Sequence, residues 1–297
     1  MGTVRRQFWQ GIEVIHDVVY FGDDIRERFD AIGLKGWWMS YFAQRSAPLG
    51  TPDAKTVTAL FHGFAPRLVE RALPDAWSLA DRDEILAARL KLAVDHLTPA
   101  IDPAAMAVVG APPCSERSGE LGGVARLAKD LEAIVDGLDF AGRPLAAAHA
   151  NLPRPNDPLE RLWWTATVLR EYRGDSHVAI LVAAGLDGAA ANALAVADGR
   201  APARQQQARG WNDDEWTAAY EHLRRRAWCN EFGEITEAGK AARAQIEDAT
   251  DRVSSACFDE EMQARAITTE TALVDLARAI NSAGAVPFPN PTATFLP

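Results

Sequence analysis

Cysteine is scarce in this chain of 297 residues, and its few copies lie far apart. The three cysteines, Cys114, Cys229 and Cys257, are odd in number, and none belongs to a Cys-x-x-Cys pair. A disulfide framework or a cysteine-rich zinc site needs more cysteines at closer spacing. The sequence therefore favours a reducing compartment, and we expect a cytoplasmic location.

Long hydrophobic runs are also missing. No apolar stretch reaches the roughly 18 residues that a membrane-spanning helix needs. The N-terminal stretch MGTVRRQFWQGIEVIHD has two arginines but lacks the apolar core of a signal peptide. We therefore expect neither a membrane segment nor a secretory signal.

Positive charge is in short supply. The chain has 31 Lys and Arg residues against 41 Asp and Glu residues, which gives a formal net charge of −10. A protein that coats nucleic acid or an anionic membrane needs a basic face. The composition therefore argues against nucleic acid and against a membrane as partners.

The common short motifs of enzymes are absent. The sequence contains no Gly-x-Gly-x-x-Gly after a strand, no Gly-x-x-x-x-Gly-Lys-[Ser/Thr] and no Gly-x-Ser-x-Gly. The six histidines are scattered and form no His-x-x-x-His pattern. We therefore predict no metal site, and the sequence names no cofactor.

Helical periodicity covers nearly the whole chain. Apolar residues recur at spacings of three and four, which is typical of amphipathic helices, and alternating β-branched runs are almost absent. Caps and breakers predict helices within the ranges 7–31, 37–48, 53–71, 81–98, 121–137, 159–174, 175–185, 187–197, 213–226, 237–253 and 259–282. The helix in the first of these ranges is expected to end before Gly22. Gly174 is expected to end one of these helices, and Asp175 to cap the next.

Proline and glycine cluster within residues 99–119 and 139–158, which predicts loops on either side of the helix at 121–137. We therefore expect an all-α fold of two helical halves. The N-terminal half covers residues 1–100, a proline-rich waist covers 101–158, and the C-terminal half covers 159–297.

The best local signal lies near residue 212. Asn212 is a good N-cap and Glu215 stands three residues later, while Trp211 and Trp216 occupy the two positions that pack across a cap. Residues 227–236 favour a short β-hairpin around Phe232-Gly233. The order helix, turn, helix, hairpin, helix is that of a winged helix.

The stretch RGWNDDEWTAAYEHLRRRAWCNEFGEITEAGKAA, residues 209–242, resembles the C-terminal part of a MarR-type winged helix. There a recognition helix precedes a wing and a helix start of the form Leu-Thr-x-x-Gly, which is Ile235 to Gly239 here. The resemblance implies that the C-terminal half is a degenerate winged helix with one short β-hairpin.

The charge of this stretch argues against DNA binding. A recognition helix usually offers its first residues to base edges, close to the phosphates. Here those residues are Asn212 and three consecutive acids, Asp213, Asp214 and Glu215. Arginines 224–226 lie at the opposite end, where they complement the helix dipole. We do not expect sequence-specific DNA binding.

More of the chain resembles a mainly actinobacterial family of proteins that carry helix-turn-helix or MarR-like labels. The resembling segments are residues 15–50, 64–77, 162–188 and 209–251. The resemblance implies one all-helical fold with winged-helix character and carries over no catalytic residue.

Residues 170–177, REYRGDSH, form the densest polar cluster in an apolar setting. In a structural interpretation, Asp175 caps a helix, Arg173 pairs with a carboxylate and His177 is hydrogen-bonded in the core. In a functional one, Arg173 holds an anionic ligand while His177 supplies a proton or a coordinating nitrogen.

Three residues of the first half could complete such a pocket. His16 lies on the apolar stripe of the first helix, and Tyr41 and Arg45 share a helix face at a spacing of four. A histidine on an apolar stripe is more often part of the core than a ligand-binding residue. We expect Arg173 and His177 to line a cavity between the halves, with His16, Tyr41 and Arg45 on the opposite wall.

The leading functional hypothesis is a cytoplasmic small-molecule-binding protein, with an anionic ligand between the two halves. One alternative is a MarR-like transcriptional regulator, whose second DNA-binding unit would come from the partner in a homodimer. The other is an enzyme of unassigned chemistry that uses His177 and Arg173.

Overall fold

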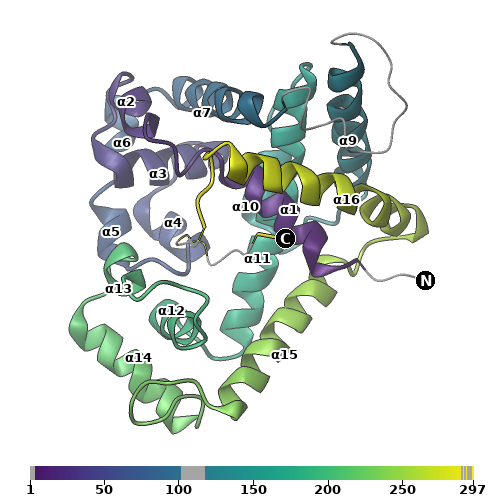
Figure 1. Cartoon of the computed structure of the whole chain (residues 1–297). Coiled ribbons are helices and arrows are strands. Elements are labelled where there is room, and N and C mark those ends of the chain that lie inside the picture. Colours follow the sequence, from purple (N-terminus) through teal and green to yellow (C-terminus); the bar gives the residue numbers. More distant parts are fainter. Residues whose placement is uncertain (1–3, 102–117, 289, 291, 293–295) are drawn as a thin grey trace.

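The structure is a computed structural model that describes residues 4–101, 118–288, 290, 292, 296 and 297. Within these residues the chain is all-helical, as the sequence predicts, and contains no β-strand. Cys114 and most of the first proline-rich stretch lie outside the described residues. Figure 1 shows the helices arranged around α11, which runs through the middle of the molecule.

The helices of the first part are short except for α7 and α9. They are α1 (Arg6–Asp17), α2 (Ile25–Asp30), α3 (Gly36–Ser46), η1 (Ala47–Leu49), α4 (Ala54–Leu60), α5 (Pro66–Glu70), α6 (Ala76–Leu79), α7 (Arg82–Leu97), η2 (Thr98–Ile101), α9 (Ser118–Asp136) and α10 (Pro144–Ala150). The predicted range 7–31 thus contains two helices, with a break at Val18–Asp24.

The second part contains the two longest of the described helices, α11 and α16. Its elements are α11 (Pro158–Ala183), α12 (Gly188–Ala197), α13 (Gln205–Ala208), α14 (Asp213–Arg225), α15 (Glu237–Ser254) and α16 (Glu260–Ser282). The predicted caps Asp187 and Asn212 are confirmed, and Asn212 and Glu215 form the reciprocal capping box.

The predicted break at Gly174 is wrong, because α11 continues through this residue. A glycine inside a helix costs about 1 kcal/mol relative to alanine. Burial on several sides of α11 outweighs that cost, since Leu169, Tyr172 and Ser176 around the glycine are all buried. The helix thereby keeps Arg170, Arg173 and His177 on one rigid element.

Asp175 does cap a helix, but that helix is α10 and not the continuation of α11. Its Oδ2 accepts hydrogen bonds from the backbone N–H groups of Leu145 and Ala146, at 2.9 and 3.0 Å. Arg143 stands at the N-cap position of α10 and makes no side-chain cap. A carboxylate from another helix therefore satisfies the first turn of α10.

The buried apolar side chains form two clusters. The larger cluster draws on residues 4–172 and 258–286, so α16 packs with the N-terminal helices. At Gly11 a Cβ would lie 2.8 Å from the Cβ of Leu273, so glycine permits the close approach of α1 to α16. The smaller cluster comes from residues 181–246 of α11, α12, α14 and α15.

The predicted β-hairpin at 227–236 is a tight turn rather than a pair of strands. One isolated antiparallel bridge joins Cys229 to Ile235, and the side chain of Asn230 accepts hydrogen bonds from the backbone of Phe232 and Glu234. Only one residue pair flanks the turn, because the Thr236 cap starts α15 at once. No extended wing is found in the described residues.

No single helix in the described part of the chain is both long and apolar enough to cross a membrane. Within the same described residues, one pair of helices, α11 and α12, reaches that length and composition when taken together, across a bend of 98°.

Candidate functional site

Two pockets lie along the middle of α11, and a third adjoins them beside α3 and α13. We call them the arginine pocket, the central pocket and the aromatic pocket. The first two share Arg170, Gly174, His177 and Arg243. The central and aromatic pockets share Phe64 and Arg209, so the three pockets adjoin one another.

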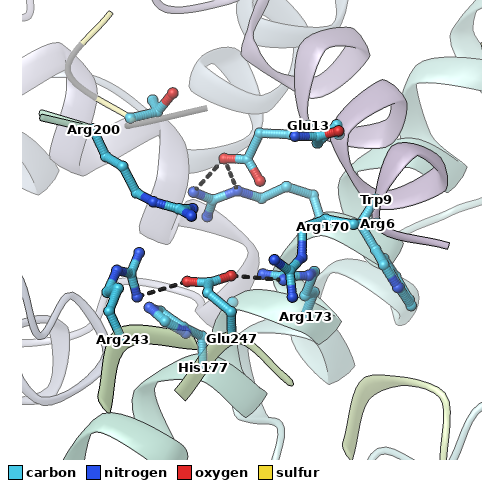
Figure 2. A pocket seen from close by; sticks show the side chains of 12 residues that line it. Arg6, Trp9, Glu13, Arg170, Arg173, His177, Arg200, Arg243 and Glu247 are labelled. Carbon is cyan, nitrogen blue, oxygen red and sulfur yellow. Dashed lines mark hydrogen bonds and ion pairs between the residues drawn. The ribbon is translucent and has the colours of Figure 1, made fainter. Parts of the chain in front are cut away.

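The arginine pocket has a volume of about 170 Å³ and lies between α1, α11 and α15. Among the described residues, five arginines and two carboxylates line it: Arg6, Arg170, Arg173, Arg200 and Arg243, with Glu13 and Glu247. Figure 2 shows the side chains of Arg200 and Arg170 reaching toward the same space, with Glu247 on the other side. The lining is thus predominantly cationic.

Glu247 organises one side of this pocket. Its carboxylate pairs with Arg243 at 2.6 Å and with Arg173 at 3.2 Å (Figure 2). Burial raises the pKa of Glu247, but the neighbouring Arg243, His177 and Arg173 outweigh this and lower it to about 2. Arg173 also contacts Asp251 at 2.6 Å, so it has two carboxylate partners.

His177 presents a neutral imidazole beside these cations. Its Nδ1 lies 2.9 Å from the hydroxyl of Thr250, and that hydroxyl donates to the carbonyl of Ile246. Because the threonine proton is already used, Nδ1–H is the donor, and Nε2 carries the free lone pair. Burial lowers the pKa of His177 to about 4, against the opposing effect of Glu247. Nε2 can therefore accept a hydrogen bond at neutral pH.

The central pocket has a volume of about 220 Å³ and contains a buried ion pair in its wall. Arg45 donates to both oxygens of Glu171 and also to the hydroxyl of Tyr41. Arg170 adds a third contact to Glu171, at 2.9 Å. Burial raises the pKa of Glu171, but Arg45 and Arg170 together hold it well below its usual range.

The aromatic pocket is the largest of the three, at about 420 Å³. Its walls come from the segment between α1 and α2, from α3, and from the segments that carry Phe64 and Arg209. Tyr41 lies in this wall. Aromatic side chains dominate the lining of this pocket, whereas arginines dominate the lining of the arginine pocket.

The five residues singled out from the sequence do not share one cavity. Arg173 and His177 line the arginine pocket, His177 and Arg45 line the central pocket, and Tyr41 lines the aromatic pocket. His16 lines none of these three pockets. It is fully buried, and its Nδ1 lies 3.1 Å from the hydroxyl of Thr167.

Sequence reasoning missed the contribution of α15 and of the segment around α13. Arg243, Glu247 and Thr250 recur at spacings of four and three, so they share one face of α15. That spacing could have grouped these three residues on one helix face from the sequence alone. Arg200 and Arg209 lie outside helices in positions that no periodicity marks.

The described residues contain no group of three or more His, Cys, Asp or Glu side chains that could hold a metal ion.

A family model described as a helix-turn-helix family matches residues 5–287 of the chain. No curated protein matches, and no solved structure matches.

Proposed function

This chain belongs to a helix-turn-helix family, and we propose that within that family it is a small-molecule-binding protein, with a pocket for an anionic ligand between its two helical halves. The observation that carries the proposal is the charge of the three pockets. Eight arginines and four carboxylates line them: Arg6, Arg45, Arg170, Arg173, Arg200, Arg204, Arg209 and Arg243, with Glu13, Glu171, Asp175 and Glu247.

This excess of positive charge in the lining contrasts with the chain as a whole, whose net charge is −10. Arginine recognises carboxylates and phosphates with a planar fork of N–H donors, and such charge-assisted bonds are about twice as strong as neutral ones. Cationic side chains gathered in a cavity of an acidic protein therefore favour a small anion over a macromolecular polyanion. The cytoplasm, where anionic metabolites are abundant, is the location we propose.

Arg173 and His177 would have complementary roles in this pocket. Arg173 would exchange part of its contact with Glu247 or Asp251 for the ligand, because each carboxylate retains another arginine: Arg243 for Glu247 and Arg6 for Asp251. The free Nε2 of His177 would accept a hydrogen bond from a ligand hydroxyl or amine.

The test is retention of a ligand and stabilisation by model anions. Native mass spectrometry of the purified protein would show a retained mass, and thermal melts with pyrophosphate and with citrate would follow. Saturating ligand raises stability by about 2.7 kcal/mol at a hundredfold excess over Kd, so we expect the Tm to rise by several degrees. Arg173→Gln should lose this rise.

Arg265→Gln is the matched control, because Arg265 also bridges two carboxylates, Asp130 and Glu261, and lines none of the three pockets. It should keep the full response to the anion. No retained mass and no Tm rise with either anion, or an equal rise in all three proteins, would count against the proposal.

The helix-turn-helix label is compatible with a second candidate, a MarR-like winged-helix transcriptional regulator that would act as a homodimer. Helix α14, the turn at 227–236 and α15 follow the order of recognition helix, wing and helix. Against it, the first turn of α14 is acidic, and its Glu215 pairs with Arg67 of α5. An enzyme that uses His177 as a base beside Arg173 is the third candidate, supported by the neutral imidazole alone.

A further inference from the structure

The aromatic pocket differs from its neighbours in size and in chemistry. Small-molecule sites usually measure roughly 300–1,000 Å³, and of the three pockets only this one, at about 420 Å³, reaches that range. Six aromatic side chains line it: Tyr20, Phe21, Trp37, Trp38, Tyr41 and Phe64. Its size and its lining therefore suit a ligand with an apolar group of several atoms rather than a small inorganic anion.

These rings hold one another in place. Trp37 stacks on Tyr41 with ring centroids 5.1 Å apart and an interplanar angle of 15°. Tyr41 also contacts Tyr20 and Phe64, with centroids 5.1 and 5.4 Å apart. Walls fixed by ring–ring contacts offer flat faces and lose little entropy on binding, which favours a planar ligand over a flexible chain.

The border between the aromatic and central pockets is cationic. Arg209 lines both, and its guanidinium lies 4.3 Å from the centroid of the Phe64 ring. Burial lowers the pKa of Arg209; the hydroxyl of Tyr41 opposes this, whereas the nearby charge of Arg45 lowers it further. Arginine stays charged at neutral pH all the same. A negative group at this border could make a charge-assisted hydrogen bond to the buried guanidinium of Arg209.

We propose that the ligand is a planar aromatic anion, whose ring system occupies the aromatic pocket and whose carboxylate, sulfonate or phosphate group reaches Arg209. This inference rests on the proposed function, because it assigns a chemical class to an anionic ligand bound in these adjoining pockets. Arg204, at the exposed side of the pocket, adds to the attraction for the anion.

The probes are 1-naphthalenesulfonate, the neutral 1-naphthalenemethanol and the aliphatic anion decanoate, each titrated into the full chain by calorimetry. We expect the sulfonate to bind at one site, and at least about tenfold more tightly than the other two. Arg209→Met should weaken the sulfonate about tenfold and leave the alcohol unchanged. Trp37→Leu should weaken both aromatic probes.

Trp216→Leu is the control for the loss of an indole, because Trp216 is a partly buried tryptophan of the smaller core and does not line these pockets. If Arg209→Met fails to fold, Arg204→Gln replaces it, with an expected weakening of the sulfonate of about threefold. Equal affinity for the sulfonate and the alcohol, equal affinity for decanoate, or insensitivity to these arginine variants would overturn the inference.

The two proposals can fail separately. If the naphthalenesulfonate does not bind while pyrophosphate or citrate still stabilises the parent and not Arg173→Gln, the aromatic class is wrong and the anion pocket stands. If the sulfonate binds as expected and Arg173→Gln leaves every anion response unchanged, the aromatic pocket stands without the arginine pocket.

Discussion

Arg45 of α3 and Glu171 of α11 form a buried ion pair with two parallel hydrogen bonds, Nε to Oε1 at 2.9 Å and Nη2 to Oε2 at 2.8 Å. The two residues are 126 positions apart in sequence, and their exposed fractions are only 8% and 0%. The pair ties the aromatic helix α3 to the central helix α11 and forms part of the wall of the central pocket.

Removing one partner of this pair should be costly. Arg45→Met leaves Glu171 buried with Arg170 as its remaining partner, and we expect a loss of about 3 kcal/mol in the free energy of unfolding. The double variant Arg45→Met/Glu171→Leu should lose less than the sum of the two single variants. Urea unfolding of all four proteins measures the coupling, and additivity within about 0.5 kcal/mol would show that the pair is not coupled.

Gly174→Ala tests the continuity of α11. A Cβ at this position would meet its nearest atoms, in Arg170 and Glu171, at 3.5 Å, which is ordinary contact. We expect alanine to stabilise the protein by about 0.5–1 kcal/mol, because it reduces the entropy of the unfolded chain. Gly188→Ala is the contrast, since its Cβ would lie 2.0 Å from the carbonyl oxygen of His62, and it should destabilise. A loss of stability in Gly174→Ala would point to a break in the helix.

Asp175 provides a test of a cap supplied by a neighbouring helix. Asp175→Ala removes the acceptor for two N–H groups of α10 and should cost about 1–2 kcal/mol, whereas Asp175→Asn keeps an acceptor oxygen.

Burial raises the pKa of Asp175 to about 6, above an unfolded value of about 3.9. The native state therefore binds the proton more tightly, and the parent should lose stability relative to Asp175→Asn as the pH rises from 4 to 6. Thermal melts of the parent and of Asp175→Asn between pH 4 and 6 are the measurement. A difference in Tm between the two proteins that stays constant over this range would contradict the raised pKa.

His177 should make stability depend on pH in the opposite direction. Its pKa is lowered to about 4 in the folded protein, against about 6.5 in an unfolded chain. The unfolded state binds the proton first, so the contribution of His177 to stability is lost as the pH falls from 6.5 to 4. The Tm of His177→Gln should decline less steeply than that of the parent over this interval. Parallel declines would mean that His177 has the same pKa in the folded and unfolded states.

DNA binding can be tested directly. Because Asp213 and Asp214 are exposed at the start of α14, we expect no complex below about 1 μM protein with DNA from the promoter of the protein's own gene at physiological salt. A mobility-shift assay over several salt concentrations is the measurement. Nanomolar binding that weakens steeply with salt would favour the transcriptional regulator instead.

Local signals in the sequence predicted most of the helices. The caps at Asp187 and Asn212 depend on residues three positions apart, so the chain itself encodes them. The predicted helix end at Gly174 was wrong because helix propensity is a local property. The burial that stabilises α11 across this glycine comes from segments that are distant in sequence. The same limit applies to Asp175, whose acceptor role depends on where α10 docks.

The pockets were harder to predict than the helices. Arg173 and His177 drew attention because polar residues cluster around them, and both line a pocket. His16 lies on an apolar stripe as a core residue would, and its packing against Tyr20 and Thr167 fits that ordinary role. Arg243 and Arg209 reach the pockets only through the docking of α15 and of the α13 segment, which no pattern within one helix encodes.

The packing of α16 against α1 has a consequence for how the nascent chain folds during synthesis. The smaller core is drawn from one continuous stretch, residues 181–246, so its helices can pack as soon as that stretch leaves the ribosome. The larger core also needs side chains from residues 258–286, which are made after nearly everything they cover. During synthesis the apolar faces of α1 and α9 therefore remain exposed to solvent, or bound by a chaperone, until α16 has been made.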